Sequence, residues 1–311
     1  MAPSSSVDPS SPLGAPLVPP SGTVMACIDQ SPYAEAVCDF AAWSAERMKA
    51  PLSFLHVLDS TSGNVPGDRN LTGTIGLGAR EDLLERLSEL DEERARLAME
   101  QGRQLLAGAV ERARKVAPGL EEATRPIETR QRHGELVDAL LAVEAETRML
   151  VLGKRGAGSA AQRGHLGRHL EEVIRAVSKP ILVAQQSFAP PERIMFAYDG
   201  SGTARKGLQM LAGSPLFRGI PCHLVYVGAD KPEARKTLDH AARALDAAGF
   251  EAEAALVPGN PDDALSRYQA EHGIDLLIMG AFGHSRIRHL ILGSTTTAML
   301  RRCTVSVMVL R

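Results

Sequence analysis

The chain of 311 residues contains one structural unit twice, and this repeat limits the possible folds more than any other feature. The motif Asp-x-Ser-x-x-Ala begins at Asp29 and again at Asp199. Further matches keep the same order in both halves: Gly134, Gly153 and Gly167 recur as Gly259, Gly280 and Gly293. Each copy alternates short apolar runs with segments of helical character, which is typical of parallel βα units. We therefore expect an α/β protein with two tandem, doubly wound parallel-sheet domains.

Composition sets the expected domain boundaries. Residues 1–21 are rich in Pro and Ser and contain neither Lys nor Arg nor an apolar run. They match no secretory or transit signal, so we expect a disordered tail. The first domain is expected at 22–187 and the second at 190–311, and 44% hydrophobic content is enough for two ordinary cores.

The first copy carries an insertion at about 60–119. From Pro51 to Gly134 there are 83 positions, whereas from Pro221 to Gly259 there are 38. The insertion begins with a glycine-rich loop and continues as a long predicted helix. Its leucine stripe, interrupted by Arg94, consists of Leu83, Leu87, Leu90 and Leu97. We favour packing of this stripe on its own domain, and the alternative is an arm that binds a partner, forms a dimer or covers the N-terminal pocket.

The second copy contains a pattern that predicts a phosphate site. The apolar run 276–279 ends at Gly280, Gly283 follows, and nine residues later Gly293 precedes Ser294. A strand that ends in glycine lets backbone N–H groups approach an anion, and the start of the next helix adds a positive end, with Ser294 as its expected N-cap. Asp199 follows another buried strand, where it either faces the ligand or caps the next helix.

The spacing G-2x-G-9x-G-[S/T] resembles the ATP-binding signature of the universal stress protein family. The resemblance to a tandem, UspA-like member covers nearly the whole chain except the tail and the insertion. It implies a Rossmann-like, adenine nucleotide alpha hydrolase-like fold, binding of ATP or AMP with Mg²⁺, and a role in the stress response. Carried over by motif, the implied nucleotide-binding residues are Asp199 and Val227 by the adenosine, Met279 and Gly280 beneath the ribose and phosphates, and Gly283, Gly293, Ser294 and Thr295 around the phosphates.

The first copy departs from this pattern. Its equivalent residues are Asp29, Gly153, Gly156 and Gly167. Ten residues rather than nine separate the last two glycines, and Arg168 stands where the second copy has Ser294. Arginine cannot replace a small hydroxyl cap, although its guanidinium can reach a phosphate or block its position. We expect a weaker or altered N-terminal site, with plain turn geometry as an equal explanation for these glycines.

Other classes of function fit less well. The chain lacks G-x-G-x-x-G after a first strand and lacks a P-loop. It shows no paired nucleophile and base and no metal-ligand cluster, so we expect nucleotide binding rather than catalysis and leave slow ATP hydrolysis open. A net charge of −2 gives no electrostatic basis for nucleic acid or membrane partners. Four scattered cysteines indicate buried thiols in a reducing cytoplasm.

Two expectations concern partners. The apolar segments 181–183 and 307–309 are the expected final strands of the two copies, and we expect them to form an intramolecular pseudo-dimer contact. A homodimer of the whole chain remains open. The rival to nucleotide binding is a protein-interaction scaffold that acts through the 60–119 insertion.

Overall fold

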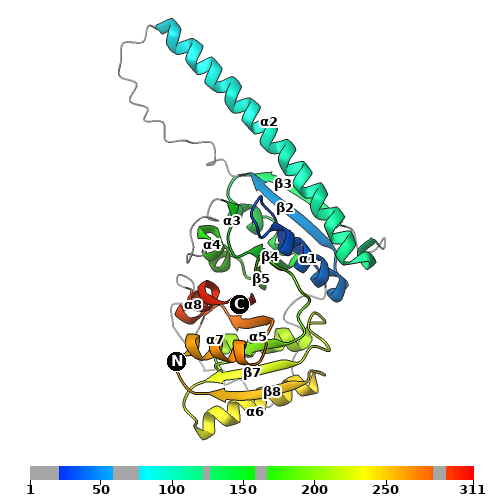
Figure 1. Cartoon of the computed structure of the whole chain (residues 1–311), viewed down its shortest axis with the longest axis vertical. Helices are drawn as coiled ribbons and strands as arrows, with labels where there is room; N and C mark the ends of the chain where they lie inside the picture. Colours follow the sequence, from blue (N-terminus) through cyan, green and yellow to red (C-terminus); the bar gives the residue numbers. More distant parts are fainter. Residues whose placement is uncertain (1–20, 59–76, 122–126, 158–166, 283–291) are drawn as a thin grey trace, which may run out of the picture. The chain divides into compact units, whose positions relative to one another are not determined.

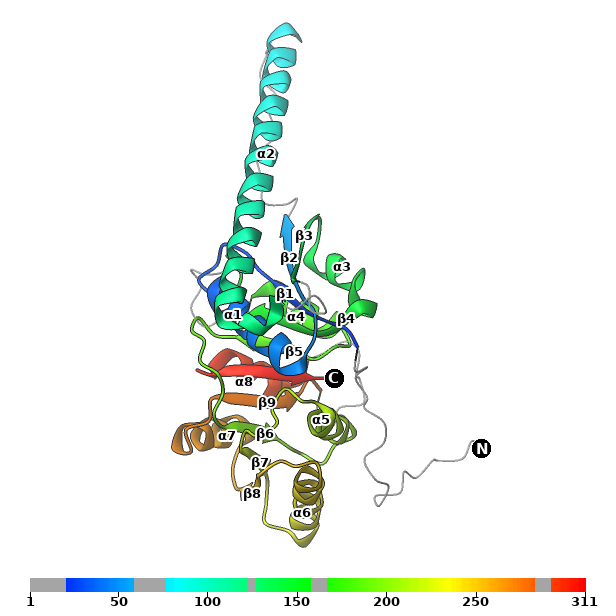
Figure 2. The ribbon, with the colours of Figure 1, turned by 90° about the vertical axis from the view of Figure 1, so that its right-hand side faces the viewer.

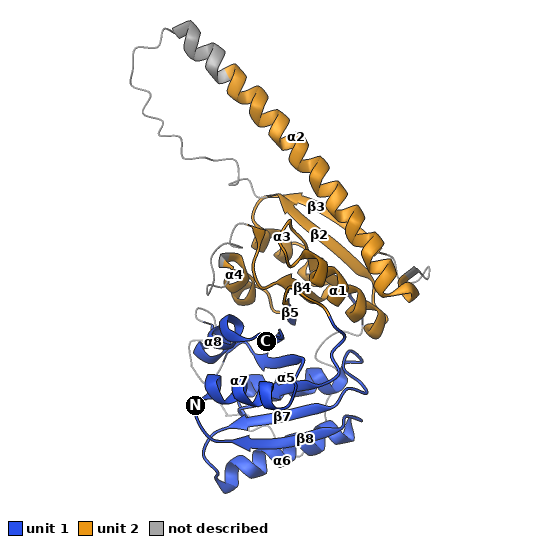
Figure 3. Ribbon diagram, in the orientation of Figure 1, with its two compact units in different colours: residues 1–22, 179–183, 189–311 blue, residues 23–178, 184–188 orange. Residues whose placement is uncertain are grey.

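The structure is a computed structural model that describes residues 21–58, 77–121, 127–157, 167–282 and 292–311 (Figure 1). It contains two compact units, which Figure 3 colours separately. The N-terminal unit comprises residues 23–178 and 184–188, and the C-terminal unit comprises 21–22, 179–183 and 189–311. Residues 179–183 therefore belong to the C-terminal unit, although the sequence-based boundary lay at 187–190. The predicted tail up to residue 20, most of the glycine-rich loop and Gly283 lie outside the described residues.

Strands and helices alternate along both units, as the repeat predicted. In the N-terminal unit the order is β1 (Thr23–Cys27), α1 (Ala34–Met48), β2 (Leu52–Leu58), α2 (Leu77–Val116), the 3-10 helix η2 (Pro118–Glu121), β3 (Ile127–His133), α3 (Leu136–Leu141), the 3-10 helix η3 (Glu144–Glu146), β4 (Thr147–Gly153) and α4 (Arg168–Ala176). The remaining elements are β5 (Ile181–Ala184), β6 (Ile194–Ala197), α5 (Gly202–Gly213), β7 (Cys222–Val227), α6 (Pro232–Ala247), β8 (Ala252–Val257), α7 (Pro261–Glu271), β9 (Leu276–Gly280), α8 (Ser294–Arg302) and β10 (Ser306–Leu310).

The sheet of the N-terminal unit has the strand order β3-β2-β1-β4, and these strands are parallel. Central β1 pairs with β2 on one side and β4 on the other, so the chain reverses its winding direction between β1 and β4. Helices α1 and α2 pack together on one face, while α3 and α4 pack together on the other (Figure 2). This is the doubly wound arrangement that the alternating pattern predicted.

The C-terminal unit repeats this arrangement, with the order β5-β10-β9-β6-β7-β8. Strands β6, β7, β8 and β9 correspond to β1, β2, β3 and β4, and their pairs are parallel. Strand β5 pairs antiparallel with β10, with Val183 opposite Val307 and Ile181 opposite Val309. The two segments predicted to pair, 181–183 and 307–309, do so within this unit.

Helix α2 follows β2 as α6 follows β7, so the two helices are counterparts. They differ in length, because α2 has 40 residues and α6 has 16. Its second half belongs to the core, where Leu106, Ala109 and Ala113 are buried. Arg112 in this half donates from Nε and Nη2 to the buried carboxylate of Asp39 on α1, at 2.6 and 2.7 Å. The helix that the sequence predicted as an insertion therefore supplies part of the domain's own core.

The first half of α2 has a different environment, because residues 85–97 are all exposed. Leu87, Leu90 and Leu97 expose 47%, 49% and 56% of their surface. The favoured interpretation, that this stripe packs on its own domain, is wrong for these three leucines, since the helix continues past the ends of β2 and β3 (Figure 1). Among the described residues, no helix combines the length and the apolar composition that a bilayer crossing requires.

Candidate functional site

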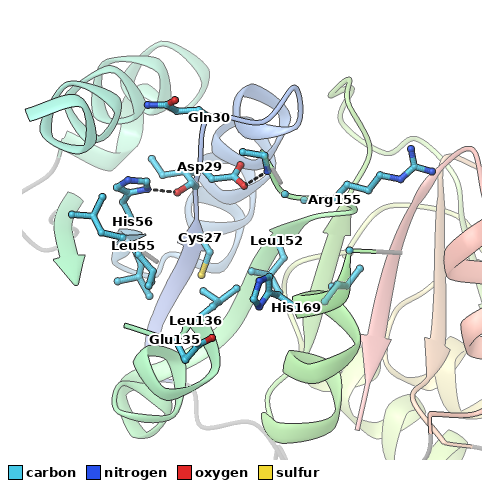
Figure 4. A pocket seen from close by; sticks show the side chains of 18 of the residues that line it. Cys27, Asp29, Gln30, Leu55, His56, Glu135, Leu136, Leu152, Arg155 and His169 are labelled. Carbon is cyan, nitrogen blue, oxygen red and sulfur yellow. Dashed lines mark hydrogen bonds between the residues drawn. The ribbon is translucent and has the colours of Figure 1, made fainter. Parts of the chain in front are cut away.

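A cavity of about 600 Å³ lies at the carboxyl ends of β1, β2 and β4 in the N-terminal unit (Figure 4). This is the edge at which open parallel sheets bind ligands. Its apolar wall is formed by Cys27, Ile28, Leu55, Val57, Leu58, Ala98, Leu136, Leu152 and Leu170. Its polar and glycine positions are Asp29, Gln30, His56, Gln101, Gly134, Glu135, Gly153, Arg155, Gly156, Gly167 and His169. The predicted first-copy residues Asp29, Gly153, Gly156 and Gly167 thus share one cavity.

Asp29 organises two loops at this cavity. Its Oδ1 accepts from the backbone N–H of Ser31 at 3.0 Å, and its Oδ2 accepts from the N–H of Ala157 at 2.8 Å. The first contact shapes the turn before α1, and the second holds the loop after β4. A carboxylate has about four lone-pair sites, so these two contacts leave acceptor capacity for a ligand hydroxyl.

Close packing explains two of the glycines. A Cβ at Gly156 would lie 2.9 Å from Asp29 Oδ2, and a Cβ at Gly153 would lie 2.7 Å from the Cβ of Tyr33. Both distances are too short for a side chain, so glycine at these positions lets the loop after β4 reach the start of α1. The structural explanation for Gly153 and Gly156 holds whether or not a ligand binds.

The start of α4 forms the wall opposite Asp29. Gly167 is the N-cap of this helix, and its N–H donates to the carbonyl of Lys154 at 3.4 Å. His169 follows in the first turn, and its buried Nδ1 has no hydrogen-bond partner within the described ranges. Arg168 is the first residue of α4, and its side chain lies outside the described part of the structure. In Figure 4 the Arg155 side chain points away from the cavity.

The inner part of the cavity is apolar and poorly solvated. Burial and the nearby Asp29 carboxylate raise the pKa of Cys27 to about 12, so its sulfur stays protonated at neutral pH. His56 is buried beside it, and its Nδ1 donates to the carbonyl of Ile28 at 2.8 Å. Because a carbonyl only accepts, this bond fixes the proton of the neutral ring on Nδ1. The inner wall therefore offers an apolar surface for a flat ring.

The C-terminal unit repeats these contacts at the predicted second-copy residues. Asp199 Oδ1 accepts from the N–H of Ser201 at 2.9 Å, as Asp29 does from Ser31. A Cβ at Gly280 would lie 3.2 Å from Thr203 Cγ2, and Gly293 N–H donates to the carbonyl of Ala281 at 3.1 Å. Val227 and Gly280 end β7 and β9, and Met279 is buried in β9. The predicted residues that are described thus lie at the carboxyl ends of these strands or at the start of α8.

One predicted detail is wrong. Ser294 is not the N-cap of α8, because Gly293 occupies that position and Ser294 begins the helix with an exposed side chain. Ser201 is the N-cap of α5 and accepts from Ala204 N–H at 3.1 Å, so Asp199 shapes the preceding turn rather than capping the helix. The predicted Thr295 lies in the first turn of α8, and its neighbour Thr296 donates from Oγ1 to the carbonyl of Gly280 at 2.8 Å.

Sequence reasoning missed several cavity residues. Val57 and His169 are the repeat equivalents of Val227 and Thr295, so aligning the copies would have found them. Ala98 and Gln101 come from α2, and Gln101 Oε1 accepts from Gln30 Nε2 at 3.4 Å. The equivalent helix of the second copy, α6, has 16 residues where α2 has 40. The repeat therefore contained no signal for the contribution of α2.

Comparison with known proteins decides the family. The sequence matches the universal stress protein family twice, over residues 21–185 and 191–311. The chain belongs to the universal stress protein family. It is a tandem member, because each half matches by itself. The universal stress protein Slr1230 from Synechocystis is 37% identical over 290 residues, which cover 93% of this chain and 99% of that protein.

Solved structures agree on the fold of this universal stress protein. A universal stress protein from Archaeoglobus fulgidus has a TM-score of 0.63 and 19% identity, covering 93% of this chain and 96% of its own. A shorter one from the same organism, described as a complex with dAMP, has a TM-score of 0.32 and 22% identity, covering 40% of this chain and 100% of its own. The first of these supports the Rossmann-like α/β fold over both halves.

Proposed function

We propose that this universal stress protein binds an adenine nucleotide, ATP or AMP, at the carboxyl ends of its strands. The observation that supports this best is the cavity of about 600 Å³, which joins Asp29 and the glycines of the first copy to the start of α4. The same residue types recur at Asp199, Gly280 and Gly293 in the motif that resembles the family's ATP-binding pattern. We therefore assign the same ligand class to both units.

The described walls fit such a ligand. A purine ring suits the apolar inner wall around Ile28, Leu55 and Leu152, because contact between the ring and these side chains removes apolar surface of both from water. Asp29 has acceptor capacity left for ribose hydroxyls, and the family resemblance implies that its counterpart Asp199 lies by the adenosine. His169 lines the cavity beside Gly167 at the start of α4, and its Nδ1 lies 3.6 Å from Glu172 Oε2.

Phosphates suit the starts of α4 and α8. The first N–H groups of a helix have no partner within that helix, and the helix dipole favours a negative charge there. Gly167 and Gly293 allow close approach, while Ser294 and Thr295 add hydroxyl donors in the second copy. Mg²⁺, when bound with the nucleotide, would neutralise phosphate charge, and its remaining ligands would be water. The first copy has Arg168 where the second has Ser294, and this difference supports stronger binding in the C-terminal unit.

Filling the cavity from α2 tests the N-terminal site. Ala98 lines the cavity, so Ala98→Trp places a large ring inside it without touching the glycine loop. Ala95, one turn earlier on α2, is exposed and does not line the cavity, so Ala95→Trp is the matched control. Calorimetric titration with ATP and with AMP should lose the N-terminal site only in Ala98→Trp. Equal binding by both variants would contradict this site.

A pair of glycine variants tests how the two sites differ. Gly167 and Gly293 have φ of −58° and −56°, which any residue adopts without strain. Gly167→Val and Gly293→Val should therefore keep the backbone conformation of the two helix starts and add bulk where phosphate approaches. At Gly167 the new Cβ would lie 3.4 Å from Arg155 Cα, so this valine also crowds the loop after β4. We expect Gly293→Val to remove the stronger site and Gly167→Val the weaker one. Two equally strong sites in the unchanged protein would contradict the inequality.

The scaffold alternative gives a different result in a simple measurement. A nucleotide-binding protein should release adenine nucleotide when the purified protein is denatured, and mass spectrometry identifies it. A scaffold with the same fold should release none and should bind none in titration. The exposed leucines of α2 favour a separate interaction role for this helix, and that role does not require an empty cavity.

A further inference from the structure

The first half of α2 carries a leucine stripe that the described part of the chain leaves uncovered. Leu87, Leu90 and Leu97 expose 47%, 49% and 56% of their surface. Their spacing of three and seven places them along one side of the helix. Single exposed leucines are common, but an aligned series on a helix that leaves its own sheet is typical of an interface.

The second half of α2 is fixed, so the stripe cannot fold back onto its own sheet. Arg112 is bound by the Asp39 carboxylate, and Gln131 Nε2 donates to the carbonyl of Met99 at 3.2 Å. Close contact at Gly102 holds the helix against β2 and β3. Most of the stability of a helix in a protein comes from packing of its apolar face, so a covering partner would stabilise this half.

We propose that the first half of α2 pairs antiparallel with the same helix in a second copy of this chain. This inference stands apart from nucleotide binding and rests on the helix alone. Leu87 and Arg94 occupy a positions of a heptad, and Leu90 and Leu97 occupy d positions. The register that we infer sets Leu87 against the partner's Leu90, and two-fold symmetry makes this contact occur twice.

Charge complementarity supports this register, and the position of Arg94 supports the orientation. Arg86 and Glu93 flank the seam at g positions, so each Arg86 lies opposite the partner's Glu93. Both side chains are exposed in the single chain and therefore available for this pairing. A parallel pair would instead bring Arg94 against the partner's Arg94 within the seam, where like charges repel. The sequence of this helix thus favours the antiparallel pair.

The room available along α2 also favours the antiparallel pair in this register. Residues beyond about 100 pack on the sheet, so a partner helix can lie only along residues 77–100. The inferred register overlaps these 24 positions, a length of about 36 Å. Moving the partner one heptad further would place its end over the part of α2 that the sheet occupies. A parallel pair would also bring both N-terminal units to the same end of the seam, where they compete for space.

Molecular mass in solution tests the proposal. The full chain should sediment with twice its own mass of 33.2 kDa at high concentration and dissociate on dilution. Leu87→Lys with Leu90→Lys should give the single-chain mass at the same concentration. Ala107→Lys, on the exposed side of the second half, is the control and should keep the dimer. Circular dichroism and the fluorescence of Trp43 show that each variant is folded.

Charge exchange tests the orientation. Arg86→Glu or Glu93→Arg alone should weaken the dimer at least tenfold, and the two together should restore it. Mixed Arg86→Cys and Glu93→Cys chains should form a disulfide between the two variants and little within each. A single-chain mass at every concentration would overturn the proposal. So would a dimer that survives the leucine substitutions or cross-links each variant mainly with itself.

Discussion

Two glycines on α2 should respond in opposite ways to the same substitution. Gly102 is buried, and a Cβ there would lie 2.3 Å from Gln131 Nε2 and 2.7 Å from His56 Cδ2. Gly108, nearly two turns later, has nothing within 4 Å of a Cβ. Alanine gains about 1 kcal/mol over glycine inside a helix. Gly108→Ala should therefore stabilise the protein by up to that amount.

At Gly102 the clash outweighs this gain. Moving Gln131 breaks its hydrogen bond to Met99, which costs about 1 kcal/mol. His56 is fixed by its bond to Ile28, so the added methyl group also overpacks the core, which costs about 1–3 kcal/mol. After the helix gain, Gly102→Ala should destabilise the N-terminal unit by about 1–3 kcal/mol.

Urea unfolding followed by tryptophan fluorescence measures the change in the unfolding free energy of the N-terminal unit. Trp43 is the single tryptophan, and it is buried on α1 against which α2 packs. With a slope of about 1–3 kcal/mol/M, the midpoint should fall by about 1 M in Gly102→Ala and rise slightly in Gly108→Ala. If both variants shift the midpoint upward alike, α2 does not lie against β2 and β3 as described.

Three further predictions follow from single contacts. Arg112→Met leaves the Asp39 carboxylate buried without its cation and should cost about 2–4 kcal/mol in the same assay, with part recovered when Asp39→Ala is added. Burial raises the pKa of Cys27 and Cys222 to about 12, so a thiol reagent at pH 8 should modify neither until urea is added, as mass spectrometry will show. Burial lowers the pKa of His223 below its ordinary 6.5, so the unfolded state takes up this proton first; stability should fall as pH drops below about 6.5, and less in His223→Gln, by circular dichroism.

Much of this fold followed from the repeat. The apolar runs and their order predicted two α/β units, and the matching motifs placed Asp29 and Asp199 at equivalent strand ends. Local patterns were less informative where a long-range contact decides the outcome. The helical period of α2 identified a leucine stripe, but which half of the helix reaches the sheet depends on contacts such as those of Gly102 with Gln131 and His56.

The candidate site was predicted unevenly for the same reason. The motif singled out the glycines and aspartates of both copies as site residues, and it ranked the second copy first because of Ser294. The structure describes the first copy's cavity most fully, with walls from His56, His169 and α2 that no motif contains. Such side chains are brought together by the winding of the sheet, which spacing along the chain does not show.

Helix α2 leaves the sheet beside the cavity and continues into solvent, so its direction is set next to the cavity wall. Ala98 and Gln101 line the cavity where α2 leaves the sheet, and the part of the helix before them, residues 77–97, is about 30 Å long. A tilt of about 10° of the helix at Ala98 and Gln101 moves its N-terminal end by about 5 Å. Any change at the cavity wall that altered the direction of α2 would therefore displace the far end of the helix more than the wall itself.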